Sequence, residues 1–578
     1  MSERDSAAED PAPVSPAGAP ASRQATLPAA SAAHVGGGHR AEPKNRPAGT
    51  ADRSKGPTGR SRLTGGLVIA VPAATSLVVG GYEIGGPSLW RDEAYTKDAI
   101  NRSVGQIFTL LGHMDAVHGA YYLLMHVVAA AIGTSATALR FPSLCAMVVA
   151  TAFTAAIGRR TAALAQPPDT AGPGRLNVPA LTGFASGMVF ATAPYMTYYA
   201  QMARSYAVVT MFATVSTYLL LVVHADGRWR WWSAYAVAAA LTGLFNIFGL
   251  LILAAHGVTL LLTDARGQSR NGRQAGRVPL RWLAAAAAAV IVLIPLLRVS
   301  FREQKQIAWL SRPDFSTVVT LFRDFAGSRA LILPVAVLAL GGIAASCLAD
   351  RWRPLNPAAV ALPWLTVPAV LLLAVSLVKP VYDERYVEFC MPALAILVGA
   401  GLVGIVRLAS AAPVRRMGLA WLPVAVAGLV VLGLAAMLAG PQAAIRQTAA
   451  RPDNLRLASA IVAANEQPGD VVFYLPVDMH VLGTGYPAPF QRLRDIALAK
   501  SPIASGTLTG TEITSPALLK SQFTDVRRVW VVTGASNDKF PVPATPVDKE
   551  KMALIAGAGM HIIHRWTAGE VMLTLYGS

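Results

Sequence analysis

Charged residues are scarce in this sequence. Asp, Glu, Lys and Arg together make up 14% of the 578 residues, whereas 53% are apolar and the mean hydropathy is +0.44. A soluble globular protein usually carries about 25% charged residues. The composition therefore excludes that class and predicts a membrane protein.

Cysteine is also rare, and its placement excludes a disulfide scaffold. Cys145, Cys347 and Cys390 lie inside or at the edges of apolar runs, and none forms a CxxC pair. The sequence therefore predicts neither a disulfide framework nor a cysteine metal site.

The net charge of +18 raises the question of a nucleic-acid partner. Lys and Arg stand in short clusters between apolar runs, however, which is the pattern that the positive-inside rule produces. A nucleic-acid interface would gather them on one face instead. We therefore expect membrane lipid around this chain and no nucleic-acid partner.

The first 62 residues contain almost no large apolar side chains. Ala, Pro, Gly, Ser and charged residues dominate 1–62, and such a composition cannot bury a core. No clear signal-peptide cleavage site follows Val79. We therefore expect a disordered cytoplasmic tail over 1–62, followed by an uncleaved first helix.

Twelve apolar runs follow the tail, most of them near the length of a membrane-spanning helix. They lie near 63–81, 118–134, 141–158, 179–197, 206–223, 232–247, 249–264, 281–298, 329–349, 361–378, 387–407 and 417–440. If the short run 118–134 crossed the bilayer, basic loops would face both sides. If it lies on the outer surface, every basic cluster is cytoplasmic, as orientation rules require.

The charge pattern thus favours a polytopic α-helical protein with about eleven transmembrane helices. The membrane domain covers 63–440, and 82–139 form its first outer loop with interfacial helices. Everything after Gly440 then also lies outside the membrane. The alternative is a twelfth span at 118–134, which would invert the second half of the chain.

Residues 441–578 differ in kind from the rest. Leu455–Ala464 has helical spacing, and four β-rich runs follow at 471–474, 528–533, 561–565 and 571–576. Helices that alternate with such runs predict a small extracytoplasmic α/β domain. It contains neither a Gly-rich phosphate loop nor metal-ligand spacing, so we favour a lid or docking role for it.

An acidic pair, Asp92-Glu93, follows the first apolar run. Carboxylates beside a membrane are costly to keep unless they have a function. Adjacent residues on a helix point about 100° apart, so one acid acts and the other holds structure by pairing with Arg91 or another basic group. The alternative is two acids that merely stabilise a helix N-terminus.

Two further groups lie in the same predicted loop. Asp115 and His118 are three residues apart and could orient a phosphate. Together with Asp92 they could also bind a divalent cation, although a metal site needs more ligands. A hydrogen-bonded support is the alternative that we favour for this pair.

Basic side chains occur in later predicted outer loops. Arg204 is a natural phosphate ligand, because a guanidinium can hold two oxygens at once. Arg385 and Lys379 can add positive charge where a leaving phosphate develops its own. The alternative for Arg385 is an ion pair with Asp383 or Glu384.

In this order, the motifs resemble the GT-C superfamily of polyprenyl-phosphate-sugar glycosyltransferases. The resemblance is closest to bacterial members akin to the protein O-mannosyltransferase and aminoarabinose lipid A transferase families. The matching elements lie within 63–407 and are Asp92-Glu93-Ala94, Asp115-x-x-His118-x-x-Tyr121-Tyr122, Arg140-x-Pro142-Ser143, Gln201-x-x-Arg204-x-Tyr206 and Glu384-Arg385-Tyr386.

The resemblance implies a GT-C fold and a role for each matching residue. Asp92 would deprotonate the acceptor, with Glu93 as the second catalytic candidate. The donor phosphate would be held by Arg204, Arg385, Lys379 and His118. The substrates would be positioned by Asp115, Tyr121, Tyr122, Gln201 and Tyr206. No cofactor is implied with certainty, and a divalent cation stays an open question.

The implied reaction moves mannose or arabinofuranose from a polyprenyl-phosphate carrier to a glycan, lipoglycan or protein acceptor. It would take place on the outer face of a bacterial plasma membrane. A transporter or lipid flippase is one alternative. Such proteins often show repeated halves and place ionisable residues near the middle of the membrane. In this sequence, only His256 lies clearly within an apolar run. An inactive GT-C-like assembly partner is another, although the acidic pair is retained.

Overall fold

The computed structural model describes residues 59–166, 176–264, 277–307, 309–348, 355–410, 421–534, 543 and 545–578. Residues 1–58, which make up most of the predicted cytoplasmic tail, lie outside the described residues. The first helix, α1, begins at Gly59 and not at Leu63, because a helix can continue beyond its apolar part. The three cysteines are free.

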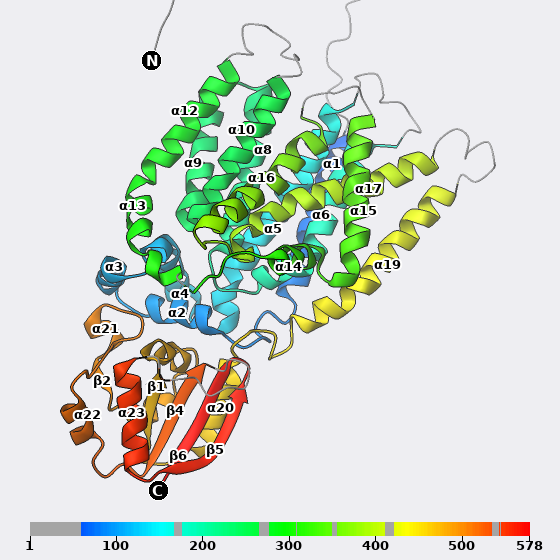
Figure 1. The fold of residues 1–578 in the computed structure, drawn as a ribbon. Coiled ribbons are helices and arrows are strands. Elements are labelled where there is room, and N and C mark those ends of the chain that lie inside the picture. Colours follow the sequence, from blue (N-terminus) through cyan, green and yellow to red (C-terminus); the bar gives the residue numbers. More distant parts are fainter. Residues whose placement is uncertain are drawn as a thin grey trace, which may run out of the picture. The chain divides into compact units, whose positions relative to one another are not determined.

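Apolar helices, most of them long, form the part of the structure that precedes the sheet domain (Figure 1). They are α1 (Gly59–Gly81), α5 (Ala136–Leu164), α6 (Val178–Thr192), α8 (Tyr206–Ala225), α9 (Trp229–Phe245), α10 (Leu251–Asp264), α12 (Arg277–Val292), α13 (Ile294–Arg302), α15 (Ile332–Leu348), α16 (Pro357–Val378), α17 (Met391–Ala409) and α19 (Leu422–Ala444). Each of the eleven predicted spans falls on one of these helices, with α12 and α13 sharing one.

The number of membrane crossings is only partly fixed by these helices. Within the described residues, six helical stretches are long and apolar enough to span a bilayer alone. The pair α12 and α13, bent by 50°, makes a seventh if it is one span. Other predicted spans fall on shorter apolar helices, including Gly65–Gly81, Val178–Thr192 and Ile247–Thr263. The count of about eleven therefore stays a prediction.

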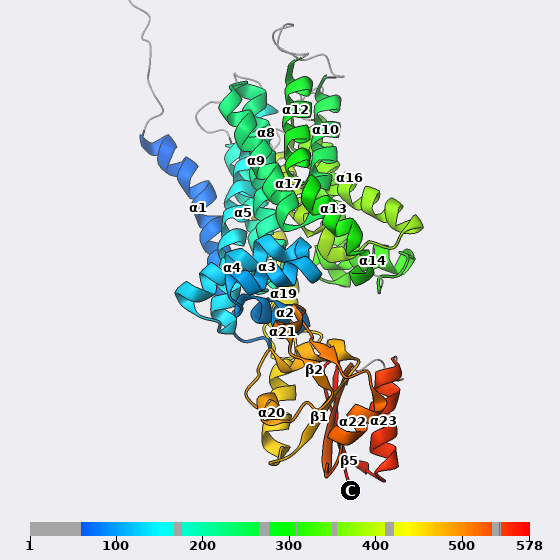
Figure 2. The same ribbon diagram turned by 90° about the vertical axis from the view of Figure 1, so that its left-hand side faces the viewer.

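The predicted first outer loop is itself helical. It contains α2 (Arg91–Ile100), α3 (Val104–His113), the 3₁₀ turn η1 (Ala116–His118) and α4 (Gly119–Ile132). The three α-helices pack side by side, as Figures 1 and 2 show. A span needs about 20 residues, and α4 has 14, so its length agrees with the predicted interfacial position of 118–134.

Short elements connect the long helices. They are α7 (Pro194–Ala200), η3 (Ile247–Leu250), η4 (Gln304–Ile307), α14 (Phe315–Ala326), η5 (Arg329–Leu331), η6 (Glu384–Tyr386) and η7 (Glu388–Cys390). Two of these connections matter for the site, namely the segment after α7 and the turn η6, because each presents an arginine to α2.

The C-terminal part is an α/β domain, and the predicted helix and four predicted strands are confirmed. Its helices are α20 (Leu455–Asn465), α21 (Pro502–Ser505), α22 (Pro516–Gln522) and α23 (Pro546–Gly557), with 3₁₀ segments η8 (Val477–Gly483) and η9 (Phe490–Arg492). Its main sheet consists of β1 (Val471–Leu475), β4 (Arg528–Gly534), β5 (His561–Ala568) and β6 (Val571–Gly577). A small second sheet pairs β2 (Leu498–Lys500) with β3 (Thr511–Glu512).

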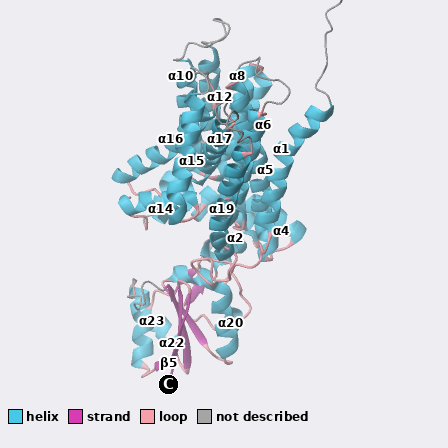
Figure 3. Cartoon of the chain, turned by 90° about the vertical axis from the view of Figure 1, so that its right-hand side faces the viewer, coloured by secondary structure: helices cyan, strands magenta, loops and turns pink. Residues whose placement is uncertain are grey.

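The main sheet has strand order β1-β4-β6-β5 and is covered on both faces (Figure 3). β1 and β4 are parallel, and the other two pairs are antiparallel. Because side chains alternate along a strand, Val472 and Trp530 pack toward α20, whereas Phe473 and Val531 belong to the opposite core with α22 and α23. Burial on both faces explains the continuous apolar runs of β1 and β4.

Hydrogen bonds join the α/β domain to α2 and to Leu89, two residues before it. The Arg91 backbone N–H and guanidinium both donate to Asp453, at 3.1 and 3.3 Å. Lys97 donates to the Gly485 carbonyl at 2.8 Å, and the Tyr486 hydroxyl accepts from the backbone of Leu89 at 3.1 Å. The helix that carries the acidic pair is therefore held from both sides, by the apolar bundle and by the sheet domain.

Candidate active site

Asp92 lies on the first turn of α2 and points to an arginine from a distant part of the chain. Its Oδ2 is 2.9 Å from Nη1 of Arg385, and each side chain is 20% exposed. α2 begins here because Trp90 is extended and the acids at 92 and 93 favour the positive end of the helix dipole. The carboxylate is thus accessible and already paired with a cation.

Arg385 is the central cation of the site. Its Nε and Nη2 each donate to one oxygen of Asp383 at 2.8 Å, which leaves Nη1 for Asp92. The guanidinium also lies 6.0 Å from the Trp90 ring and 5.7 Å from the Trp309 ring. Of the two partners considered from the sequence, Arg385 binds Asp383, and Asp92 is an additional partner.

Charge and burial oppose each other at Arg385. Burial lowers the pKa of its guanidinium, but the Asp383 and Asp92 carboxylates more than compensate, so the pKa lies above its usual value. A guanidinium has five N–H groups, and the hydrogen bonds of Arg385 to Asp383 and Asp92 use three of them. The remaining two are available to an anion beside Asp92.

Arg204 is a second arginine beside Asp92. It is 7% exposed and follows α7 in the chain. Its Nη1 is 3.5 Å from the backbone oxygen of Asp92, and its Nη2 is 2.7 Å from Nε2 of His118. Its Nε has no hydrogen-bond partner within the described part of the chain.

His118 orients Arg204 and is not a second cation. Because arginine only donates, Nε2 of His118 must accept, which places the proton on Nδ1. Burial and the neighbouring Arg204 lower the pKa of His118 to about 4, so the imidazole is neutral at pH 7. Asp115 and Tyr122 stand behind it: Asp115 Oδ1 is 3.7 Å from Nε2, and the Tyr122 hydroxyl donates to Asp115.

Glu93 is the structural member of the acidic pair in this arrangement. Its side chain is fully buried, and Arg140 donates to both oxygens at 2.8 and 2.7 Å. The backbone N–H of Ala203 adds a third bond at 2.8 Å. Burial raises the pKa of Glu93, but the Arg140 charge outweighs it and the net direction is down. Such a carboxylate has no access to a substrate.

The remaining residues suggested by the sequence are placed differently. Gln201 is buried and donates to the carbonyls of Gly80 and Tyr82, at 3.0 and 2.9 Å, so it fastens the end of α1. Lys379 is exposed and bonds Gln304. No hydrogen bond within the described residues joins either side chain to Asp92, Arg204 or Arg385.

Tyr121 and Tyr206 are both buried, with exposures of 1% and 3%. Tyr206 packs edge-on against Tyr199, with ring centroids 5.4 Å apart. Both rings therefore help to form the packed support beneath Arg204 and do not present an accessible surface.

Sequence reasoning missed the two indole rings beside Arg385. Trp90 belongs to the motif of the acidic pair, and the signal was its position directly before Asp92. Trp309 lies more than two hundred residues away in a loop without a motif. Only the folded chain shows that it flanks the same guanidinium.

The set considered for a divalent cation, Asp92, Asp115 and His118, does not assemble. Asp92 is turned to Arg385, and Nε2 of His118 is turned to Arg204. Within the residues that the structure describes, no three His, Cys, Asp or Glu side chains are placed to hold a metal ion together.

Comparison with known proteins reveals the fold. No protein-family model matches the sequence, and no curated protein does. The apo crystal structure of ArnT from Cupriavidus metallidurans matches over 89% of this chain and 98% of its own, at 15% identity and a TM-score of 0.54. The same protein bound to undecaprenyl phosphate matches over 88% and 97%, at 15% identity and a TM-score of 0.52.

ArnT is a GT-C aminoarabinose transferase. The chain has the GT-C fold. A mycobacterial arabinofuranosyltransferase, AftD, is also similar, over 88% of this chain and 41% of its own, at 17% identity. Its TM-score is 0.43.

The GT-C fold was predicted from motifs spread over 63–407, and at the level of the fold this prediction is confirmed. The agreement extends beyond those motifs, because the match with ArnT covers 89% of the chain. The described residues therefore combine apolar helices with a small C-terminal sheet domain in the fold of ArnT.

Proposed function

We propose that this protein is a glycosyltransferase that moves a sugar from a polyprenyl-phosphate carrier to an acceptor hydroxyl. The observation that carries the proposal is the contact of Asp92 with Arg385, together with the contact of Arg204 with the backbone oxygen of Asp92. One accessible base beside a half-buried and a buried guanidinium group suits a reaction in which a hydroxyl loses a proton and a phosphate leaves.

The carrier is suggested by the fold and by the charges. An ArnT structure with this fold contains undecaprenyl phosphate. In the present chain, Arg385 has two N–H groups without a partner among the described contacts, and Arg204 has its Nε. Guanidinium groups recognise phosphate oxygens in pairs, so both arginines support binding of the donor phosphate.

The chemistry follows from these positions. The acceptor hydroxyl oxygen attacks the anomeric carbon and forms the new glycosidic bond, while its proton passes to Asp92. The bond from the anomeric carbon to the phosphate oxygen breaks, and its electron pair remains on the polyprenyl phosphate. Arg385 and Arg204 stabilise the developing charge, and a general base contributes about 10²–10⁴-fold. Attack opposite the leaving group inverts the anomeric centre.

Mannose and arabinofuranose are the sugars that we propose, with a cell-envelope glycan, lipoglycan or protein as acceptor. The composition, rich in Ala, Arg and Gly, is typical of a high-GC bacterium. In an actinobacterium the carrier would resemble decaprenyl phosphate bearing mannose or arabinofuranose. The proposed location is the plasma membrane, with Asp92 and the sheet domain on the outer face. The predicted position of every basic cluster on the cytoplasmic side supports that orientation.

The test uses purified full-length protein with decaprenyl-phosphate mannose or decaprenyl-phosphate arabinose and a membrane extract as acceptor source. The readout is release of decaprenyl phosphate. We expect release from one donor and a loss of about 10²–10⁴-fold in the rate of release in Asp92→Asn. The control Asp226→Asn should keep full activity, because its carboxylate pairs with Arg228 in a loop far from Asp92 in the sequence.

Three results would contradict parts of the proposal. Release that Asp92→Asn leaves unchanged refutes Asp92 as the base. Absence of release from either donor refutes both proposed sugars. Movement of labelled carrier across a vesicle membrane without release of its phosphate would favour the flippase alternative.

A further inference from the structure

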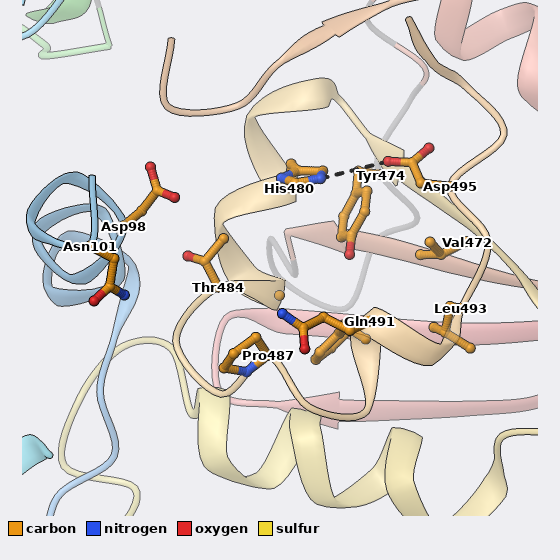
Figure 4. A pocket seen from close by; sticks show the side chains of 12 residues that line it. Asp98, Asn101, Val472, Tyr474, His480, Thr484, Pro487, Gln491, Leu493 and Asp495 are labelled. Carbon is orange, nitrogen blue, oxygen red and sulfur yellow. Dashed lines mark ion pairs between the residues drawn. The ribbon is translucent and has the colours of Figure 1, made fainter. Parts of the chain in front are cut away.

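A second cavity lies beside α2, away from Asp92. It has a volume of about 300 Å³ and is lined by the end of α2 and by the α/β domain. Figure 4 shows Asp98 and Asn101 of α2 on one side, and residues such as Thr484, His480 and Gln491 on the other. Ligand cavities in proteins measure about 300–1,000 Å³ and combine apolar walls with a few polar groups.

Among the described residues, the cavity wall contains no Lys or Arg. Its polar members are two carboxylates, two amides, one hydroxyl, one phenol and one imidazole, and its other members are apolar: Asp98, Asp495, Asn101, Gln491, Thr484, Tyr474, His480, Val472, Gly483, Pro487, Phe490 and Leu493. A phosphate would find no positive counter-charge here. This cavity therefore differs in kind from the arginine-lined site at Asp92.

One of the two carboxylates already has a cationic partner, because Asp98 is 2.6 Å from Nη2 of Arg102. The other, Asp495, is 3.7 Å from Nε2 of His480. Burial raises the pKa of Asp495 to about 6, while the nearby Lys551 acts in the opposite direction. Asp98 therefore presents no isolated negative charge to a cation.

His480 provides a hydrogen-bonding group without a protein partner. Its Nε2 is 3.7 Å from Asp495, and its ring lies 4.8 Å from the Tyr474 ring. Burial lowers the pKa of His480 to about 4, so the ring is neutral at pH 7. Nδ1 of His480 is buried and has no hydrogen-bond partner within the described residues, and a buried unpaired polar atom is costly.

From this cavity we infer a binding site for a neutral saccharide unit of the acceptor, an inference that rests on the proposed glycosyl transfer. Each sugar hydroxyl can donate and accept hydrogen bonds at once, which suits the carboxylates, amides and neutral imidazole of the cavity wall. The apolar ring faces of a sugar match Tyr474 and Phe490. The ligand class is thus a polyhydroxyl without net charge.

The geometry of α2 indicates which sugar unit of the acceptor binds in the cavity. Asp92 and Asp98 are six residues apart, which is a rise of about 9 Å and a rotation of about 240°. The cavity therefore faces another side of the helix than the proposed base. A saccharide unit held at Asp98 is remote from the reacting hydroxyl and serves to position a longer acceptor.

The test measures binding separately from transfer. Full-length protein in detergent is titrated with mannotriose and with an arabinofuranose trisaccharide, and saturation-transfer NMR detects the bound sugar. Gln491→Ala and Thr484→Val remove exposed or half-buried lining groups, and Gln522→Ala, an exposed glutamine of the same domain, is the matched control. We expect binding to be at least tenfold weaker in the two lining variants and unchanged in the control.

Transfer assays on the same variants separate this inference from the proposed function. With a long acceptor we expect KM to rise at least tenfold while kcat stays unchanged. Absence of trisaccharide binding in the wild type, or equal binding in all variants, overturns the saccharide site. Preferential binding of glucosamine or of a phosphorylated sugar overturns its neutral specificity. Specific trisaccharide binding without any transfer activity retains the site and refutes the proposed reaction.

Discussion

Asp92 and Arg385 are 293 residues apart in sequence and 2.9 Å apart in the structure. Arg385 is held in turn by both oxygens of Asp383, so the cation has a fixed orientation when it reaches the proposed base. The pair joins the first helix after α1 to the turn before α17. Any substrate that approaches Asp92 meets this guanidinium at the same time.

Arg385→Lys should impair transfer although the charge is retained. A lysine ammonium cannot bind both oxygens of Asp383 and also reach Asp92 and a phosphate. Loss of one preorganised donor to a developing charge typically costs about 10²–10³-fold in kcat. The measurement is kcat for decaprenyl phosphate release, with Arg228→Lys as the exposed control, and equal rates in both variants would contradict the role of Arg385.

Glu93→Gln should affect stability in the first place. The substitution leaves the Arg140 guanidinium buried without its counter-charge, and breaking such a pair typically costs about 3–5 kcal/mol. The control is Asp226→Asn, whose carboxylate is 40% exposed and whose partner Arg228 is 66% exposed, and a surface pair contributes about 0–1 kcal/mol. Thermal unfolding in detergent measures both, and a smaller loss of Tm in Glu93→Gln than in the control would refute the structural assignment.

The low pKa of His118 predicts a pH dependence of stability. The ring titrates at about 4 in the folded chain and at about 6.5 when unfolded. Between these two pH values the unfolded state therefore binds more protons than the folded state, and a falling pH favours unfolding. The contribution of His118 to the stability of the folded state is complete above pH 6.5 and is lost as the pH falls to 4. In the Tm profile between pH 7 and 4, His118→Gln should flatten this decline, and an unchanged slope would contradict it.

Two glycines permit a close crossing of α15 and α17. A Cβ on Gly401 would lie 2.0 Å from the Leu338 carbonyl oxygen, and one on Gly342 would lie 2.0 Å from that of Leu397. Small residues allow such backbone approach between membrane helices. Gly401→Ala should therefore lower the Tm and the yield of folded protein.

The control for this crossing is Gly428→Ala, because a Cβ there meets no atom within 4 Å. It should leave Tm unchanged or raise it slightly, since alanine favours a helix more than glycine does. Equal effects of the two substitutions would show that the crossing is not close.

Much of the architecture was predictable because it depends on local sequence. Apolar runs mark the long helices, and alternation with β-rich runs marks the C-terminal domain, as the agreement of 471–474 with β1 illustrates. The motifs were sufficient to predict the GT-C fold. The number of crossings was not fixed in this way, because length and hydropathy alone do not say whether a short apolar helix crosses.

What the sequence by itself determined is which side chains are available, namely an acidic pair on one helix and single arginines in loops far along the chain. Which acid is accessible was decided only by tertiary structure. Glu93 and Asp92 are neighbours, but their helical positions turn one to Arg140 in the buried interior and the other to Arg385. His118, predicted to hold the donor phosphate, is neutral because folding half-buries it beside Arg204. Burial and long-range pairing are properties of the packed chain, and no spacing in the sequence encodes them.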